Sequence, residues 1–186
     1  MPSPYNVAVL VGSLRKASLS RKMALAADKL SPPSLSCTIV EIGELDLYDE
    51  DAEAEAPPAW TAFRTAMKAA DAVLFVTPEY NRSVPGLLKN AIDVGSRPYG
   101  QSVFDGKPGA VISVSPGVIG AFGANHHLRQ SLVFLNVPTM QQPEAYIGGA
   151  AKLFDDAGEF TNPGTREFIG KFMAAFGDWV GKHAKG

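Results

Sequence analysis

Short apolar runs alternate along this chain with longer segments in which apolar residues recur at helical spacing. The short runs are rich in Val, Ile and Leu and are closed by Gly, Pro or Ser, which is typical of buried strands. They predict strands at 5–11, 36–42, 72–76 and 110–114, with a short fifth strand near 138–142.

The longer segments predict helices between these strands. Trp60, Phe63 and Met67 recur at i, i+3 and i+7 and so share one helical face, which is more typical of a core than of a cofactor contact. The predicted helices cover 20–30, 60–70, 84–94, 121–135 and 165–182. The acidic stretch 44–55 lacks this pattern, and we expect a solvated surface loop there.

The alternation of strands and helices predicts a parallel sheet that is covered by helices on both faces. Because crossovers between parallel strands are right-handed, few topologies remain. Five strands fit a flavodoxin-like three-layer α/β sandwich with strand order 2-1-3-4-5, which binds its ligand between strands one and three. No repeat or linker divides the sequence, so we expect a single domain over residues 1–186.

Composition narrows the class of protein further. The chain has 186 residues, 46% hydrophobic and 19% charged, with a formal net charge of −2, so it lacks the basic stripe that is typical of nucleic-acid binders. No run reaches the length of a membrane span, and no secretory leader is evident at the N-terminus. Cys37 is the single cysteine and is more typical of a small core residue than of a nucleophile. We expect a soluble cytoplasmic protein with neither nucleic acid nor membrane as a partner.

The loop after the first predicted strand carries the residue types that hold a phosphate. A helix that starts there offers free backbone N–H groups and the positive end of its dipole. Gly12 permits a tight exit from the strand, and either Ser18 or Ser20 could cap the helix. The further candidate donors and cations are Ser13, Arg15, Lys16 and Arg21. The Walker and Rossmann glycine motifs are both absent, which argues against a nucleoside triphosphatase and a dinucleotide site. The loop can be interpreted either as a phosphate-binding loop or as an ordinary polar loop, and both interpretations remain open.

The loop after the third predicted strand is rich in turn residues. Residues 78–81 read Pro-Glu-Tyr-Asn and are followed by Pro85 and Gly86, which predicts an ordered turn with unpaired N–H groups. A flavin ring needs such donors around its edge. A rigid surface turn with Tyr80 packed over it explains the same residues equally well.

Several other polar residues are weaker candidates. His126 and His127 are adjacent and would point apart on a helix, so we expect no metal site there. Ser113 and Ser115 lack the G-x-S-x-G context of a hydrolase nucleophile. For Lys89, Asn90 and Asp93, a ligand role and a structural role both remain open, and we do not assign Glu79 as a general acid.

Taken together, these motifs resemble the NADPH-dependent FMN reductases, a family that includes bacterial chromate, azo and quinone reductases. The resemblance rests on residues 12–20, on Pro-Glu-Tyr-Asn at 78–81 and on Pro-Gly-Leu-Leu-Lys-Asn-Ala-Ile-Asp at 85–93. It continues through Ser-Arg-Pro at 96–98, Gly-Val-Ile-Gly at 117–120 and Leu-Arg-Gln at 128–130, and so covers nearly the whole chain.

The resemblance implies bound FMN and a homodimer or homotetramer. It places Ser13, Arg15 and Ser20 at the phosphate, residues 78–81 along the isoalloxazine ring, and Ser115 at a further flavin contact. The candidate cofactor-binding residues are Ser13, Leu14, Arg15, Ser18, Ser20, Arg21, Pro78, Glu79, Tyr80, Asn81 and Ser115. Arg82 and Ser83 are the candidate substrate-binding residues. Leu19, Arg82 and the segment 122–127 depart from the family pattern.

The function that the resemblance implies is an FMN-dependent oxidoreductase. Hydride from NADPH or NADH would pass through FMN to a small acceptor such as a quinone, a metal oxyanion like chromate, an azo compound or free flavin. We expect ping-pong kinetics and no catalytic side chain or metal ion. An alternative is a flavodoxin-like electron carrier that does not oxidise pyridine nucleotide, and another is an FMN-free regulator on the same fold.

Overall fold

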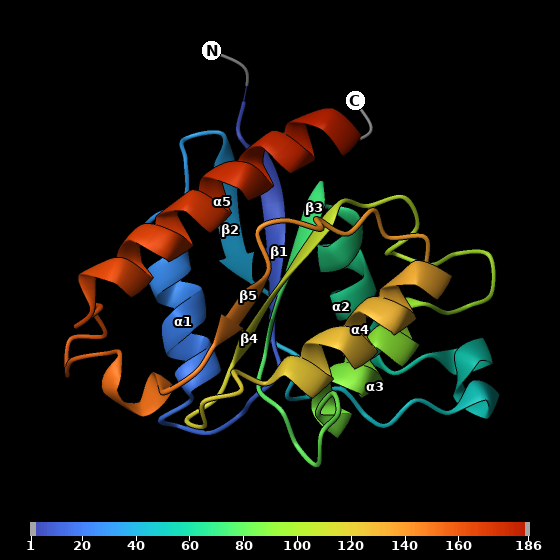
Figure 1. Ribbon diagram of the computed structural model, residues 1–186. Coiled ribbons are helices and arrows are strands. Elements are labelled where there is room, and N and C mark those ends of the chain that lie inside the picture. The colour runs from blue at the N-terminus through green and yellow to red at the C-terminus, as the bar shows by residue number, and fades with distance from the viewer. Residues whose placement is uncertain (1–2, 185–186) are drawn as a thin grey trace.

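A computed structural model describes residues 3–184 and shows a five-stranded parallel sheet (Figure 1). The strands are β1 (Tyr5–Val11), β2 (Leu35–Ile39), β3 (Ala72–Thr77), β4 (Gly109–Val114) and β5 (Ala145–Ile147). Their order is β2-β1-β3-β4-β5, which confirms the predicted order and the flavodoxin-like α/β class. Residues 1, 2, 185 and 186 of the expected domain lie outside the described residues.

Helices cover both faces of the sheet, and the central strands β1, β3 and β4 are buried on both sides (Figure 1). Val7, Val9 and Val11 of β1 face α1 (Leu19–Asp28) and α5 (Pro163–His183), whereas Ala8 and Leu10 face the opposite layer. That layer consists of α2 (Pro58–Lys68), α3 (Gly86–Gly95) and α4 (Phe122–Phe134). Trp60, Phe63 and Met67 are buried in it, which confirms the predicted core face. None of the helices within residues 3–184 has the length and apolarity that a membrane crossing requires.

The predicted fifth strand near 138–142 is wrong, because β5 lies at Ala145–Ile147. Proline has no N–H to donate to a sheet ladder; Pro138 is the first residue of the predicted segment, and Pro143 directly follows it. Only Thr139 forms an isolated bridge there, opposite Gly109. The acidic stretch also differs from a plain loop, since 50–55 form a short 3-10 helix, η1, and a second one, η2, covers 150–152.

The strand order leaves an uncovered point at the carboxyl end of the sheet. After β1 the chain runs through α1 on one face to β2, and after β3 it runs through α3 on the other face to β4. The two connections therefore diverge, and the loops after β1, β3 and β4 gather at the bottom of Figure 1. Such a reversal is where open α/β sheets bind their ligands.

Asn90 has a structural role in shaping the layer of α2 and α3. Its side chain is 8% exposed. Its Oδ1 accepts from the backbone N–H of Tyr48 (2.8 Å), and its Nδ2 donates to the carbonyls of Leu45 (3.3 Å) and Asp46 (3.0 Å). Lys89 and Asp93 instead form an exposed ion pair of 2.8 Å along α3. These contacts favour the structural role for Asn90.

We expect Asn90→Ala to lower the free energy of unfolding by about 1–3 kcal/mol, because backbone groups of the 45–48 segment lose their buried partner. Urea unfolding of the purified variant measures this change. Lys171→Ala is a suitable control, since it removes only a surface ion pair with Glu167. Equal stability losses in the two variants would contradict the assigned role of Asn90.

Candidate functional site

A small hollow lies at the carboxyl end of the sheet, beside the first turn of α1. Its volume is about 220 Å³. The residues that line it are Ser13, Arg15, Ser18, Leu19, Ser20, Pro78, Glu79, Tyr80, Val114, Ser115 and Pro116. Gly12 lets the loops after β1 and β3 meet, because a Cβ atom there would lie 3.0 Å from Pro78 Cδ. Three segments that are distant in sequence thus form one site.

The first turn of α1 is arranged to receive an anion. Ser18 is the N-cap: its Oγ accepts from the Arg21 N–H (3.1 Å), while its own N–H donates to the Arg15 carbonyl (3.0 Å). The amides of Leu19 and Ser20 open the helix and so lie outside its i→i−4 ladder. The helix dipole adds positive potential at this end. Amides and dipole together make this turn a ready anion site.

Side chains around that turn add to the positive and hydrogen-bonding character. Ser13 and Ser20 line the hollow while being 8% and 1% exposed, so their hydroxyls are held close to its wall. Arg15 is exposed at the rim, and none of the carboxylates within residues 3–184 forms an ion pair with it. Hydroxyls, free amides and an available guanidinium are the donor set that a phosphate ester requires. These residues fit the phosphate end of a nucleotide cofactor.

The opposite wall is the Tyr80 loop, which we define as residues 78–83. Asn81 and Arg82 have φ values of 52° and 62°, and Tyr80 and Ser83 exchange backbone hydrogen bonds of 3.2 and 3.0 Å around them. Two successive left-handed residues inside such a pair form the tight turn of a two-residue hairpin. The ordered turn predicted from sequence is therefore confirmed, and its shape is fixed by the backbone.

The structure brings together only part of the predicted set. Eight candidates line the hollow: Ser13, Arg15, Ser18, Ser20, Pro78, Glu79, Tyr80 and Ser115. Leu14 is 62% exposed and lies over Gly43, and Asn81, Arg82 and Ser83 sit beyond the rim. Leu19, Val114 and Pro116 line the hollow and were missed. The place of Val114 and Pro116 on either side of Ser115, at the end of a buried strand, was the available indication.

Arg21 lies outside the hollow and is engaged elsewhere. Its guanidinium donates to both carboxylate oxygens of Glu41, at 2.6 and 3.1 Å. The bidentate hydrogen bond with Arg21 lowers the pKa of Glu41 below its usual value. Arg21 would reach a bound anion only by giving up this ion pair.

The two histidines point apart, as expected for neighbours on a helix. His126 Nε2 lies 3.0 Å from the Tyr146 hydroxyl, whereas His127 Nδ1 lies 3.0 Å from Ser83 Oγ. Burial is the main reason that the pKa of Tyr146 rises to about 12. In the described part of the chain, no three His, Cys, Asp or Glu side chains cluster as a metal site. Burial likewise raises the pKa of the Cys37 thiol above its usual value.

Comparison with known proteins agrees with this geometry. The family model for the NADPH-dependent FMN reductases matches residues 5–152. A quinone reductase from Pseudomonas putida is 66% identical over 97% of each chain, and a 2-hydroxy-1,4-benzoquinone reductase from Burkholderia sp is 44% identical over 94% of this chain and 95% of its own.

A solved structure extends the match to three dimensions. The flavoenzyme FerB from Paracoccus denitrificans, an NAD(P)H:(acceptor) oxidoreductase, superposes with a TM-score of 0.92 at 44% sequence identity. The match covers 97% of this chain and 100% of FerB. Together with the family model and the phosphate-type hollow, this agreement assigns FMN as cofactor and NAD(P)H as co-substrate. The chain therefore belongs to the NADPH-dependent FMN reductase family and is an oxidoreductase.

Proposed function

We propose that this chain is an FMN-dependent NAD(P)H oxidoreductase whose electron acceptor is a quinone-type small molecule. The observation that carries the proposal is the meeting of an anion-binding helix N-terminus with the Tyr80 loop in a single hollow. The acceptor class is supported by relatives that are named for quinone reduction. Metal oxyanions, azo compounds and free flavin remain further acceptors to test.

The residues of the hollow divide the work of holding FMN. Ser13, Arg15, Ser18, Ser20 and the first amides of α1 hold the phosphate, and the Tyr80 loop and Ser115 border the ring. When bound, FMN supplies the redox chemistry by accepting hydride and delivering electrons. The side chains named here bind and orient, and none of them needs to act as an acid or a base. Leu14 and Asn81 belong to the same two loops but do not line the hollow.

The hollow is too small to enclose an entire flavin nucleotide. Ligand pockets usually have volumes of about 300 to 1,000 Å³, whereas this one has about 220 Å³. One side of the ring is therefore left open to the nicotinamide and the acceptor in turn, which leads to ping-pong kinetics. Arg82, with a side chain that is 71% exposed, and Ser83 stand beyond the rim, where Arg82 suits the phosphates of NAD(P)H.

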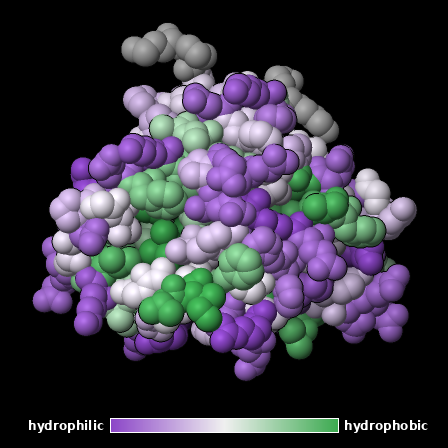
Figure 2. Space-filling view, viewed as in Figure 1, coloured by the Kyte–Doolittle hydropathy of each residue, from purple (hydrophilic) through white to green (hydrophobic). Residues whose placement is uncertain are grey.

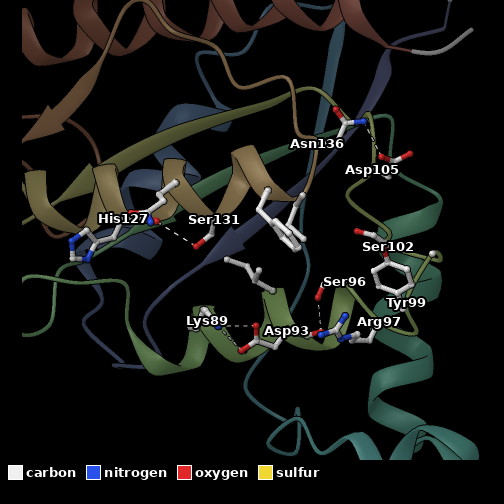
Figure 3. Close-up of a pocket in the computed structure, with 15 residues that line it drawn as sticks. Lys89, Asp93, Ser96, Arg97, Tyr99, Ser102, Asp105, His127, Ser131 and Asn136 are labelled. Atoms are coloured by element: carbon white, nitrogen blue, oxygen red, sulfur yellow. Dashed lines mark hydrogen bonds and ion pairs between the residues drawn. The ribbon is translucent and has the colours of Figure 1, made fainter.

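The open side also favours a second copy of the chain as a partner, and we propose a homodimer, with a homotetramer as the larger alternative. The groove between α3 and α4 has a volume of about 880 Å³ (Figure 3). Lys89 and Asp93 lie along α3 on one wall, and His127 and Ser131 lie along α4 on the other. The groove thus offers both signs of charge to an identical surface.

Exposed apolar side chains border the same groove. Phe134 and Tyr99 line it and are 84% and 86% exposed, and the neighbouring Val133 is 78% exposed. Figure 2 shows hydrophobic surface on the right, over the carboxyl end of α4. A protruding aromatic ring next to a groove on the same face is self-complementary, as a two-fold interface requires. His127 lies in this groove and contacts Ser83, so the partner would come close to the hollow.

We propose that the protein is localised in the cytoplasm. Cys37 is a free thiol, which fits a reducing compartment. Both substrates of the proposed reaction are small molecules, and the net charge of −2 offers no basic surface for nucleic acid.

The proposed reaction is tested by spectroscopy and steady-state kinetics. We expect the purified protein to show flavin absorbance and to oxidise NAD(P)H with a quinone, giving parallel double-reciprocal lines. Flavin absorbance without NAD(P)H oxidation would instead identify an electron carrier. A protein that takes up no FMN would refute the proposal.

Arg15→Ala tests the phosphate assignment. Loss of a charge-assisted hydrogen bond to the phosphate, worth about 1.5–3 kcal/mol, should raise the Kd for FMN by about 10- to 100-fold. Titration of the apoprotein with FMN measures the Kd, and circular dichroism checks that the fold is retained. Lys16→Ala is the matched control, because Lys16 is the adjacent exposed cation and does not line the hollow. An unchanged FMN affinity in Arg15→Ala would refute the assignment.

Phe134→Glu tests the proposed dimer face. A carboxylate in place of the exposed ring should shift the protein toward monomer, because the charge cannot be buried against an identical copy without a partner. Sedimentation equilibrium measures the mass. Leu47→Glu is the control, since Leu47 is 81% exposed but lies away from the groove. If Phe134→Glu keeps the mass of the parent protein, α3 and α4 do not form the interface.

A further inference from the structure

The beginning of α4 is capped by a residue from a distant loop. Its N-cap position is Ala121, whose methyl side chain cannot accept a hydrogen bond. Glu79, from the Tyr80 loop, accepts through Oε2 from the Ala124 N–H at 3.0 Å. A carboxylate at the third amide of a helix satisfies an open donor and lies at the positive end of the helix dipole. Glu79 therefore does for α4 what Ser18 does for α1.

The second oxygen of the same carboxylate holds the turn of the Tyr80 loop. Arg82 Nη1 donates to Glu79 Oε1 at 3.1 Å. The Glu79 side chain is only 11% exposed, whereas that of Arg82 is 71% exposed. Glu79 is thus a largely buried bridge with the helix amide on one side and the turn cation on the other.

Close packing reinforces this bridge. A Cβ atom at Gly123 would lie 2.8 Å from the Arg82 carbonyl oxygen and 2.9 Å from Glu79 Oε2, so the first turn of α4 presses directly on the Tyr80 loop. One turn further along the helix, His127 contacts the Ser83 hydroxyl at 3.0 Å. Two turns of α4 therefore hold both ends of the hairpin turn.

Such a support matters because the turn has an uncommon conformation. Asn81 and Arg82 both occupy the left-handed region, which residues other than glycine rarely adopt. A turn of this kind keeps one shape only where its surroundings determine it. Glu79 and Tyr80 also line the hollow, so the shape of the turn sets the wall against which the flavin ring would lie.

We propose that Glu79 is a positioning residue whose carboxylate fastens the Tyr80 loop to the N-terminus of α4 and so presets the loop for the flavin ring. This inference rests on the proposed function, because it assigns the ring to that wall. The carboxylate acts through the α4 amide and the turn, and takes no part in proton transfer. The bridge links residues 79 and 124, so sequence spacing gives no indication of it.

The test uses two variants of the full-length protein. Glu79→Ala removes both ends of the bridge, so we expect the Kd for FMN to rise by about tenfold and the flavin absorption band to change shape. Glu79→Gln keeps an oxygen for the Ala124 amide, so we expect it to restore FMN affinity to within about threefold of the parent. Hydrogen exchange at Ala124 should accelerate by about 5- to 10-fold in Glu79→Ala, as for loss of a cap.

Asn162→Ala is the matched control for simple loss of a helix cap. Asn162 Oδ1 accepts from the Thr165 N–H at 2.9 Å at the start of α5, and it does not line the hollow. This variant should lose a comparable amount of stability and keep the FMN affinity of the parent. A merely structural Glu79 would behave in the same way.

The outcomes separate the positioning role from the proposed function. FMN affinity within twofold of the parent in Glu79→Ala, with faster exchange at Ala124, would overturn the positioning role and leave only a cap. A Glu79→Gln variant as weak as Glu79→Ala would also overturn it, because charge rather than the α4 contact would then decide affinity. If Glu79→Ala fails to fold, Glu79→Asp replaces it, because the shorter side chain withdraws the carboxylate from the Ala124 amide. A Kd for FMN within twofold of the parent in Glu79→Asp, with faster exchange at Ala124, would then overturn the positioning role. Failure of the parent itself to bind FMN would refute the proposed function instead, and Ala124 exchange would still test the bridge.

Discussion

The divergence of the chain after β1 and β3 is the constraint on which the site depends. These strands are neighbours, yet their following helices pack on opposite faces of the sheet. The backbone at their carboxyl ends is therefore left without a covering helix, and the amides that begin α1 face the open side. The chemistry of the hollow follows from topology first and from individual side chains second.

Buried polar side chains hold the loops at this end in place. Ser113, at 0% exposure, donates to the Gly120 carbonyl at 2.7 Å and receives a hydrogen bond from the Asn125 amide at 3.2 Å. Arg129 donates through Nε to Asn125 Oδ1 at 2.9 Å. This chain of contacts joins α4 to the loop that carries Ser115, just as Glu79 joins it to the Tyr80 loop. One helix thus supports two walls of the hollow, and buried networks of this kind favour a single conformation.

Local sequence patterns predicted the parts of the fold that local physics controls. Apolar runs and helical spacing located β1, β3 and β4 and the buried face of α2, because burial repeats with the period of the element. The fifth strand lies a few residues later than predicted, at Ala145–Ile147, because the segment 138–142 contains Pro138, is mostly polar and is followed by Pro143. Arg21 was expected near a phosphate from its position in the loop, but its partner Glu41 lies 20 residues away in sequence, in the segment after β2. Contacts between residues so far apart in sequence depend on how the layers pack, and no periodic pattern in the sequence indicates them.

The two tryptophans of the chain occupy opposite layers of the sandwich. Trp60 is fully buried beside α3, with the Arg64 guanidinium 5.4 Å from its ring, whereas Trp179 lies on α5 and stacks on His183 at 3.9 Å. The fluorescence of each indole therefore reports on the unfolding of its own layer. Fluorescence of variants that retain only one of the two tryptophans would reveal whether both layers unfold in one cooperative step or whether α5 detaches first.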